Sequence, residues 1–282
     1  MSFDRLKDWI GKTQTVEDFV APWPVRALSA TLDEEDPDPE LNHPLPPLWH
    51  WLYFLETVRA SKLGPDGHPE RGDFLPPVPL PRRMWAGSRF MFDGEPLRIG
   101  DTIYRRSTIK SVEAKSGSTG EMVFVTVQHI VHGPNGVSVI EDHDIVYREA
   151  AKAGEQSRPA KPAPTNAEWS RQVLPDEPLL FRFSALTFNG HRIHYDQPYV
   201  TGTEGYPGLV VHGPLMGLLQ IELARRSNPG KIARSFEFRA LSPVFAGNPL
   251  TVGARRESDG AVTTWIANAQ GGLAQQGKAT FR

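Results

Sequence analysis

The feature that most constrains the fold is an approximate internal repeat. Each half of the 282-residue chain has an apolar segment, residues 47–61 and 212–226, followed by several strand-like segments. Both apolar segments are predicted to be helices. Gly100 and Gly247 lie at equivalent places in the two halves, each a few residues after a proline. Such self-similarity indicates a duplicated structural unit.

The segments after each predicted helix have the pattern of antiparallel strands. Val123, Val125 and Val127 alternate with more polar residues, so they are expected to share one face of a strand. The strings HGPNG and ESDG supply turn residues for hairpins. A long meander of this kind, following one helix, predicts a curved sheet wrapped around that helix.

The second apolar segment is the stronger helix prediction. Its apolar residues surround the helix on nearly all sides, which is typical of a buried helix. They are Leu215, Met216, Leu218, Leu219, Ile221 and Leu223. Pro214 suits its first turn. The aromatic residues of 47–61 are expected in the core. The predicted class is therefore α+β, with two antiparallel sheets, each wrapped around a central helix.

Composition sets the domain boundaries and excludes several functions. Residues 151–165 are rich in Ala and Pro and have the character of a linker, between a domain over 1–150 and another over 166–282. Residues 1–13 are expected to form a short amphipathic helix, not a signal peptide. The net charge of −2, with no basic stripe, argues against nucleic acid as a partner.

Two further absences in the sequence bound the function. No run of about 18 apolar residues is present, so no membrane span is expected. The chain has no cysteine, which excludes disulfides and thiolate nucleophiles and leaves the cytoplasm as the expected compartment.

Three of the nine histidines fall within residues 181–215. His191 and His194 are three residues apart, but no cysteine or carboxylate pair completes a metal set, so no metal is expected. Gly213 begins the predicted buried helix, where backbone N–H groups lack partners and the helix dipole is positive. His212 precedes it directly.

This arrangement suits one class of chemistry. A thioester carbonyl beside the Gly213 amide would be polarised, and its enolate oxygen would be stabilised. A histidine such as His194 can take a proton from water or from the α carbon. The residues therefore predict hydration of a double bond conjugated to a thioester. The alternative is that His194 caps or packs the helix, and that Tyr195 and Asp196 only form a turn.

From Phe183 to Asp196, and again at GLVVHGPL, the sequence resembles the MaoC-like enoyl-thioester hydratases of the hot-dog fold. Their signature is Asp-x-Asn-Pro-x-His-x-Asp, followed by an apolar-His-Gly step. The resemblance implies that His194 is catalytic and that Gly213 is the oxyanion donor. It places Asn189 where the family has its catalytic Asp.

Asn189 departs from the signature because an amide cannot accept a proton as a carboxylate does. The resemblance leaves two alternatives: Asn189 orients water for His194, or His191 shares the acid/base role. Asp196 and His212 fall on signature positions and are expected to support the site.

The strings LPRRMWAGSRFMF and DIVYRE extend the resemblance to a subgroup with a double hot-dog. It includes mesaconyl-C4-CoA hydratases, itaconyl-CoA hydratases and mitochondrial 3-hydroxyacyl-thioester dehydratases. The resemblance implies an N-terminal half without a catalytic loop, which widens the acyl pocket and completes an internal pseudo-dimer. A homodimer is left open. Coenzyme A would enter as part of the substrate, with no separate cofactor.

The expected activity is a hydro-lyase acting on a short, C5 dicarboxylic enoyl-CoA. Substrate contacts are expected from Arg83, Trp85, Arg89 and Tyr195. A 3-hydroxyacyl-carrier-protein dehydratase, a thioesterase and a non-catalytic acyl-binding protein are the alternatives. A thioesterase would want a carboxylate near the carbonyl, yet Glu222 lies ~13 Å along the helix from Gly213 at about 1.5 Å per residue.

Overall fold

The computed structural model describes residues 3–117, 120–150 and 159–282. The strands are β1 (Thr13–Phe19), β2 (Arg82–Met91), β3 (Thr102–Gly117), β4 (Gly120–Gly133), β5 (Gly136–Arg148), β6 (Trp169–Val173), β7 (Ala233–Ala240), β8 (Leu250–Arg256), β9 (Val262–Ala267) and β10 (Leu273–Phe281). The helices are α1 (Pro22–Thr31), α2 (Glu177–Leu186), α3 (Gln197–Gly202) and α4 (Gly213–Arg226), with short 3-10 helices η1 (Asp4–Trp9), η2 (Trp49–Leu52), η3 (Ala60–Lys62) and η4 (Arg192–His194).

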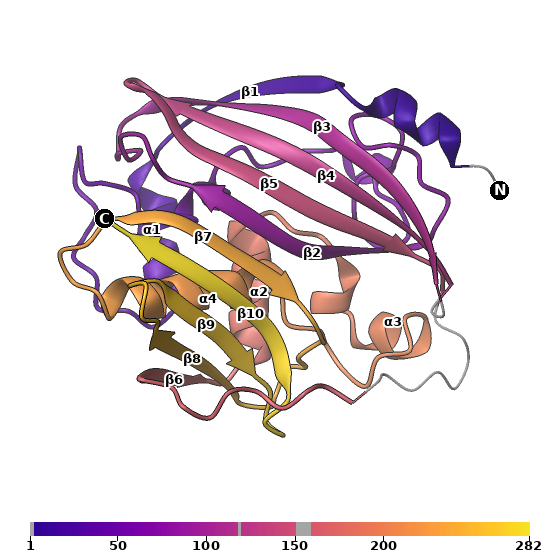
Figure 1. Cartoon of the computed structure of the whole chain (residues 1–282). Helices are drawn as coiled ribbons and strands as arrows, with labels where there is room; N and C mark the ends of the chain where they lie inside the picture. The colour runs from indigo at the N-terminus through magenta and orange to yellow at the C-terminus, as the bar shows by residue number, and fades with distance from the viewer. Residues whose placement is uncertain (1–2, 118–119, 151–158) are drawn as a thin grey trace.

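The described strands form one antiparallel sheet in the order β1-β3-β4-β5-β2-β7-β10-β9-β8-β6 (Figure 1). Strands β1–β5 belong to the N-terminal half (residues 3–150), and β6–β10 to the C-terminal half (residues 159–282). The halves join where β2 pairs with β7, from Gly87 opposite Arg239 to Met91 opposite Ser235. The two predicted sheets are thus fused edge to edge into one.

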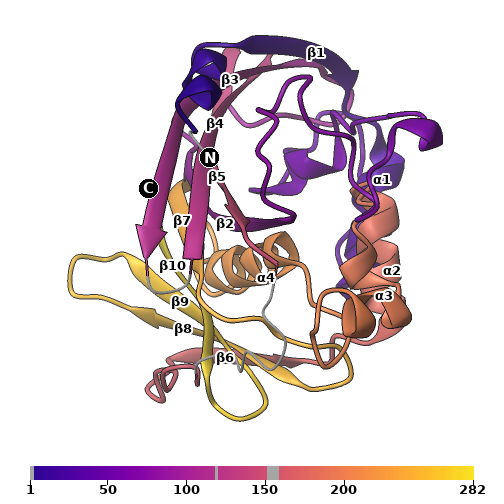
Figure 2. The ribbon, with the colours of Figure 1, turned by 90° about the vertical axis from the view of Figure 1, so that its right-hand side faces the viewer.

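The sheet curls around α4, as Figure 2 shows from the side. This confirms the buried helix predicted for the second half. Leu215 and Ile221 have no exposed surface. Even its polar residues are paired: Gln220 donates to Gln275 at 2.6 Å, and Glu222 accepts from the Trp49 indole at 2.9 Å.

The predicted helix over residues 47–61 is wrong. The 3-10 turn η2 forms there, and the 3-10 turn η3 begins at its end, but no α-helix does. Two prolines precede the segment, and Leu48 and Phe54 adopt positive φ angles of 69° and 59°, so the backbone cannot continue as an α-helix. The aromatic residues are nevertheless core, as expected, because Trp49 is 1% exposed. Their burial, rather than helix periodicity, explains the apolar run.

The predicted strands and turns are confirmed in both halves. Val123, Val125 and Val127 are buried on one face of β4. Gly100 and Gly247 both take positive φ angles, 97° and 78°, which accounts for glycine at equivalent turns of the repeat. The N-terminal amphipathic helix is reduced to the 3-10 helix η1.

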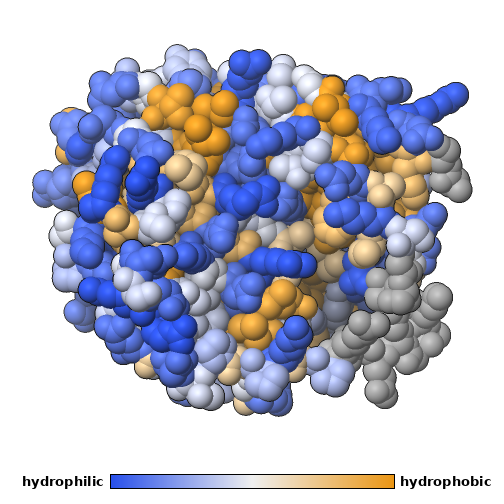
Figure 3. All heavy atoms as spheres, in the orientation of Figure 1, coloured by the Kyte–Doolittle hydropathy of each residue, from blue (hydrophilic) through white to orange (hydrophobic). Residues whose placement is uncertain are grey.

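The proposed division into domains and a linker stays a prediction. Residues 151–158 of the linker lie outside the described residues. Residues 159–165 form no helix, and Pro162 makes an isolated β-bridge with Gly272. In the view of Figure 3, polar residues cover most of the surface, with separate apolar patches between them. No helix in the described part of the chain is long and apolar enough to span a membrane.

The close approach of α4 to the sheet generates a stability prediction. A Cβ added at Gly217 would lie 2.8 Å from the Phe238 ring, which is held among the rings of Phe90 and Phe236. Gly217→Ala is expected to lower the unfolding free energy by about 1–2 kcal/mol, since overpacking outweighs the better helix propensity of alanine. Urea denaturation measures it. Gly208→Ala, with no neighbour within 4 Å of the new Cβ, is the control. Equal midpoints for both variants would contradict the packing argument.

Candidate active site

Two histidine rings stack at the N-terminus of α4. His194 ends η4, and His212 is the N-cap residue of α4. Their ring centroids are 3.6 Å apart at an interplanar angle of 19°. His212 is fully buried, and its Nε2 lies 2.8 Å from the Ser184 hydroxyl of α2. The predicted histidine cluster therefore forms, with His212 holding the His194 ring in place.

The hydrogen bonding of His194 fixes which nitrogen is free. Its Nδ1 lies 2.7 Å from the Val210 carbonyl oxygen. A carbonyl only accepts, so Nδ1 donates and the neutral ring keeps a lone pair on Nε2. Burial lowers the pKa of His194 to about 4. The ring is thus neutral at physiological pH and able to act as a base.

Gly213 presents a backbone donor beside these rings. Its amide N–H makes no hydrogen bond within the described part of the chain, and it stands at the positive end of α4. An added Cβ would come within 3.9 Å of Trp85 on β2. Trp85 therefore forms a wall next to the predicted oxyanion donor, and it stacks on His143 at 3.8 Å.

The other residues of the signature shape the loop. The Asn189 Oδ1 accepts from the His191 backbone N–H at 3.0 Å, so this oxygen is already engaged. Asp196 caps α3 by accepting from the Tyr199 N–H at 3.0 Å, and it also pairs with Arg192. Tyr195 is half exposed and donates to the Gly190 carbonyl at 2.9 Å. Asp196 and Tyr195 hold the local backbone.

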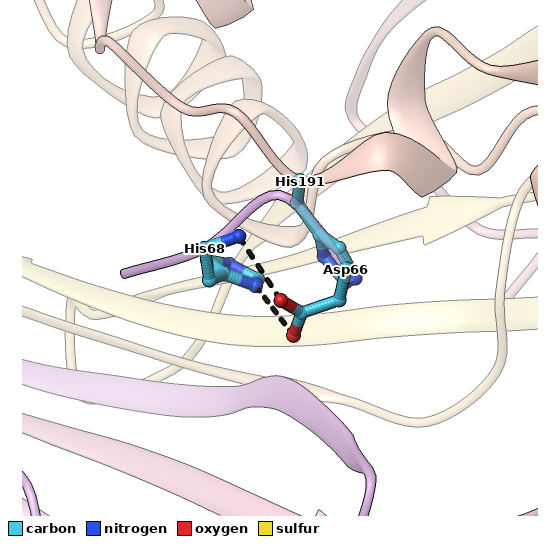
Figure 4. A group of neighbouring side chains, drawn as sticks. All are labelled: Asp66, His68 and His191. Atoms are coloured by element: carbon cyan, nitrogen blue, oxygen red, sulfur yellow. Dashed lines mark hydrogen bonds and ion pairs between the residues drawn. The ribbon is translucent and has the colours of Figure 1, made fainter. Parts of the chain in front are cut away.

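Sequence reasoning missed two residues that the N-terminal half places here. Asp66 and His68 lie beside His191, as Figure 4 shows. The His68 Nδ1 donates to the Asp66 carboxylate at 3.2 Å, and the His68 ring centroid lies 4.1 Å from that of His191. The string Asp-Gly-His, between glycine and proline residues, was the available signal. Nothing in it indicates which distant loop it contacts.

Backbone contacts fix this loop against the predicted catalytic loop. The Arg192 N–H donates to the Asp66 carbonyl at 2.9 Å, and the Arg192 side chain donates to the Pro65 carbonyl. Gly67 has a φ of 86°, and an added Cβ would lie 2.0 Å from the Gly190 carbonyl oxygen. Only a pair of glycines permits so close an approach.

One grouping of side chains has the spacing that a metal site requires. It consists of Asp66, His68 and His191, each of which offers one metal-ligand atom within 4.8 Å of the others. Their chemistry fits a metal poorly. A structural zinc site has four ligands, one more than this group offers, and Asp66 is already bonded to His68. Burial lowers the pKa values of His68 and His191, and the positive charge of Arg83, which acts on all three groups, lowers them further. A divalent cation would face the same repulsion.

A bulge in β2 separates the arginines that were expected to contact substrate. The register shifts between Trp85 and Gly87. Arg83 and Trp85 precede the shift and share one face, near the histidines. Arg89 follows it and lies on the exposed face, bound to Asp144. The structure thus brings Arg83 and Trp85 to the histidine cluster but not Arg89.

Burial of the histidines generates a prediction about acid stability. Six of them have lowered pKa values, with burial as the largest cause: His68, His129, His143, His191, His194 and His212. Between pH about 6.5 and about 4 the unfolded chain therefore binds more protons than the folded chain. Stability should fall as the pH falls from 7 to 5, by up to about 1.4 kcal/mol per pH unit for each proton. Urea midpoints at pH 7, 6 and 5 measure this. Midpoints that stay constant would show that the rings protonate freely in the fold.

Comparison with solved structures confirms the double hot-dog fold. A MaoC-like dehydratase from Phytophthora capsici superimposes with a TM-score of 0.72 over 100% of this chain and 98% of that one, at 13% identity. A Mycobacterium tuberculosis protein described as having a double hot-dog fold covers 97% of this chain and 96% of its own, with a TM-score of 0.58 and 14% identity.

Comparison of sequences extends the likeness to named enzymes. Mesaconyl-C(4)-CoA hydratase of Chloroflexus aurantiacus is 47% identical over 251 residues, 89% of each chain. The mitochondrial hydroxyacyl-thioester dehydratase type 2 of Schizosaccharomyces pombe is 29% identical over 84% of this chain and 88% of its own. Residues 48–246 match the family model described as hydroxyacyl-thioester dehydratase type 2. The chain belongs to this family.

Proposed function

We propose that this protein is a hydro-lyase that adds water across the α,β double bond of a short dicarboxylic enoyl-CoA, such as mesaconyl-C4-CoA. The observation that carries the proposal is the neutral His194, whose Nδ1 is bonded to the Val210 carbonyl so that its lone pair is on Nε2, and whose ring stacks on His212 at the N-terminus of α4. The 47% identity to a mesaconyl-C(4)-CoA hydratase supports the substrate class.

The proposed reaction uses a base and an oxyanion donor. The thioester oxygen accepts from the Gly213 N–H, and the dipole of α4 stabilises the enolate as it forms. The oxygen of a water molecule bonds to the β carbon while one of its protons passes to the His194 Nε2. The imidazolium then gives that proton to the α carbon as the enolate collapses. Net addition of one water results, and the reverse sequence is dehydration. Coenzyme A takes part only as the thioester group of the substrate.

Arg83 is the proposed receptor for the second carboxylate. It precedes Trp85 by two residues on the same face of β2, about 6.6 Å along the strand, which is comparable to the length of a four-carbon diacyl group. Among the ion pairs of the described residues, Arg82 binds Glu204 and Arg89 binds Asp144, while Arg83 takes part in none. A guanidinium matches a carboxylate through paired hydrogen bonds.

The surroundings of Trp85 favour a short polar acyl group over a long chain. Glu141 is buried behind it and accepts from Ser88 at 2.9 Å and from the Trp51 indole at 3.2 Å. His143 covers the Trp85 ring. An acyl tunnel for a fatty chain would instead be lined by apolar side chains.

Two alternatives are separated by one observation each. A thioesterase is disfavoured because Glu222 is buried and bound to Trp49, Arg225 and Arg226, away from Gly213. The fission yeast relative is named a hydroxyacyl-thioester dehydratase, a name that leaves the thioester carrier open, so a 3-hydroxyacyl-carrier-protein dehydratase is the second candidate. Cytoplasmic location, homodimer formation and the absence of nucleic-acid partners stay predictions.

The test is an ultraviolet assay of the purified protein with crotonyl-, mesaconyl- and itaconyl-CoA. Loss of the conjugated enoyl-thioester absorbance, without release of free coenzyme A, is the expected result. Release of free coenzyme A would indicate a thioesterase. No change with any of the three would count against the proposal and favour a carrier-protein substrate or a binding protein.

His194→Ala is expected to reduce turnover by about 10²-fold or more, the usual scale for a lost general acid/base. The same absorbance assay measures it. His43→Ala, at an exposed histidine paired with Glu40, is the matched control and should keep full turnover. Turnover close to that of the unmodified protein in His194→Ala would exclude the proposed base.

Arg83→Met is expected to raise KM for mesaconyl-C4-CoA by at least about 10-fold, because a charged hydrogen bond contributes about 1.5–3 kcal/mol. Crotonyl-CoA, which lacks the second carboxylate, should be affected far less. Arg89→Met removes an arginine from the opposite face of the same strand and serves as the control. An equal loss for both substrates would assign Arg83 a role unrelated to the carboxylate.

A further inference from the structure

The carboxylate that the family signature has at position 189 is missing from this chain. Position 189 holds an amide, whose Oδ1 is already bonded to the His191 N–H. The Asp66 carboxylate nevertheless lies next to the predicted catalytic loop. One of its oxygens is within 4.8 Å of a ring nitrogen of His68 and of a ring nitrogen of His191. Asp66 comes from the N-terminal half, which was expected to carry no catalytic group.

Asp66 is connected to His194 through a row of rings. Its carboxylate accepts from the His68 Nδ1 at 3.2 Å. The His68 and His191 ring centroids are 4.1 Å apart, and those of His191 and His194 are 5.4 Å apart at an interplanar angle of 87°. Because the Nδ1–H donates to the carboxylate, the neutral His68 ring carries its proton on Nδ1 and its lone pair on Nε2.

The backbone fixes this arrangement rather than leaving it to side-chain flexibility. Asp66 Oδ1 accepts from the His68 N–H at 3.0 Å, which forms the turn, and the Asp66 carbonyl accepts from the Arg192 N–H. The facing glycines, Gly67 and Gly190, allow the two loops to touch.

The charges around the row define how it titrates. His191 faces His68, His194, Asp66 and Arg83. His68 faces Asp66, Arg83 and Arg71. Burial lowers the pKa of His68 to about 4, so this ring is neutral above that pH. Burial by itself raises the pKa of Asp66, but the hydrogen bonds from His68 and the nearby positive charges, Arg83 included, together outweigh it and lower that pKa. At physiological pH the row thus consists of one carboxylate and neutral imidazoles.

We propose that Asp66 and His68 supply, from the N-terminal half, the carboxylate-backed imidazole that takes the place of the carboxylate absent at position 189. The inference rests on the proposed function. The His68 Nε2 orients the attacking water by accepting its second hydrogen bond, His191 packs between His68 and His194, and Asp66 is a positioning residue that holds the His68 tautomer. The Asp66 charge also stabilises the imidazolium that forms on His194 during the reaction. The active site is thereby divided between the two halves of the chain.

Asp66→Asn is the decisive variant because it keeps an Oδ1 acceptor for the His68 N–H and leaves the Asp66 carbonyl unchanged. We expect kcat to fall by about 10²-fold, with KM changed less than about 3-fold. Glu70→Gln, the same chemical change at an exposed carboxylate of this loop paired with Lys62, is the matched control and should leave kcat unchanged.

A second variant separates lost chemistry from lost structure. Asn189→Asp, introduced into the Asp66→Asn background, restores a carboxylate at the position of the family signature. We expect kcat to recover by at least about 10-fold over Asp66→Asn alone. A misfolded loop could not be rescued by a change on the opposite loop. The ¹⁵N signals of the His68 ring should also shift from the Nδ1–H tautomer towards a tautomeric mixture in Asp66→Asn.

The outcomes distinguish the two proposals. An unmodified protein that hydrates none of the substrates overturns the proposed function. Hydration by the unmodified protein and by Asp66→Asn at equal kcat overturns only this inference, as does failure of Asn189→Asp to rescue. Activity that is lost on dialysis against a chelator and restored by Zn²⁺ would assign the three residues to a metal and overturn it as well.

Discussion

The pairing of β2 with β7 is the interaction on which the rest of the molecule depends. It fuses two curved sheets into one and makes β2 a central strand with a neighbour from each half. Because β2 then runs past the N-terminus of α4, Trp85 from the first half comes to lie beside Gly213 from the second. Ion pairs between Arg82 and Glu204, and between Arg226 and Asp36, reinforce the same junction.

Burial gives the histidines their chemical character. Water would leave an imidazole partly charged near neutral pH, whereas desolvation lowers the pKa values of His194 and His212. The Val210 carbonyl then selects the tautomer of His194. A neutral ring with a chosen lone pair beside an unpaired backbone N–H combines a proton acceptor with an oxyanion donor, which is the pairing that addition to an enoyl thioester requires.

The sequence revealed those parts of the fold and site that are encoded locally. The all-round apolar pattern of α4, the alternation in β4 and the glycines at 100 and 247 each reflect a local backbone requirement. His194, His212 and Gly213 could be grouped because they lie close together along the chain. The helix predicted over residues 47–61 was wrong because burial alone can produce an apolar run. The positive φ angles of Leu48 and Phe54, which prevent a helix, leave no signal in hydropathy.

The position of Asp66 and His68 beside the predicted catalytic loop could not be predicted from the sequence. Pro65 and Arg192, which join the two loops, are 127 residues apart. Whether two such loops meet depends on how the halves dock, and that depends on the β2–β7 register. The opposite placement of Arg83 and Arg89 depends on the bulge after Trp85, which the alternation of residue types does not reveal.

The central position of β2 also has a consequence for synthesis of the chain. Roughly 140 residues separate the end of β2 from the start of β7. At about 5–20 residues per second, the strand emerges on the order of 10–30 s before its second neighbour exists. During that interval one side of β2 is an open edge with unsatisfied backbone groups, a template for pairing with other chains. The strand that shapes the site is thus also the one that the half-made protein leaves open to pairing with other chains, along the stretch from Gly87 to Met91 that β7 later covers.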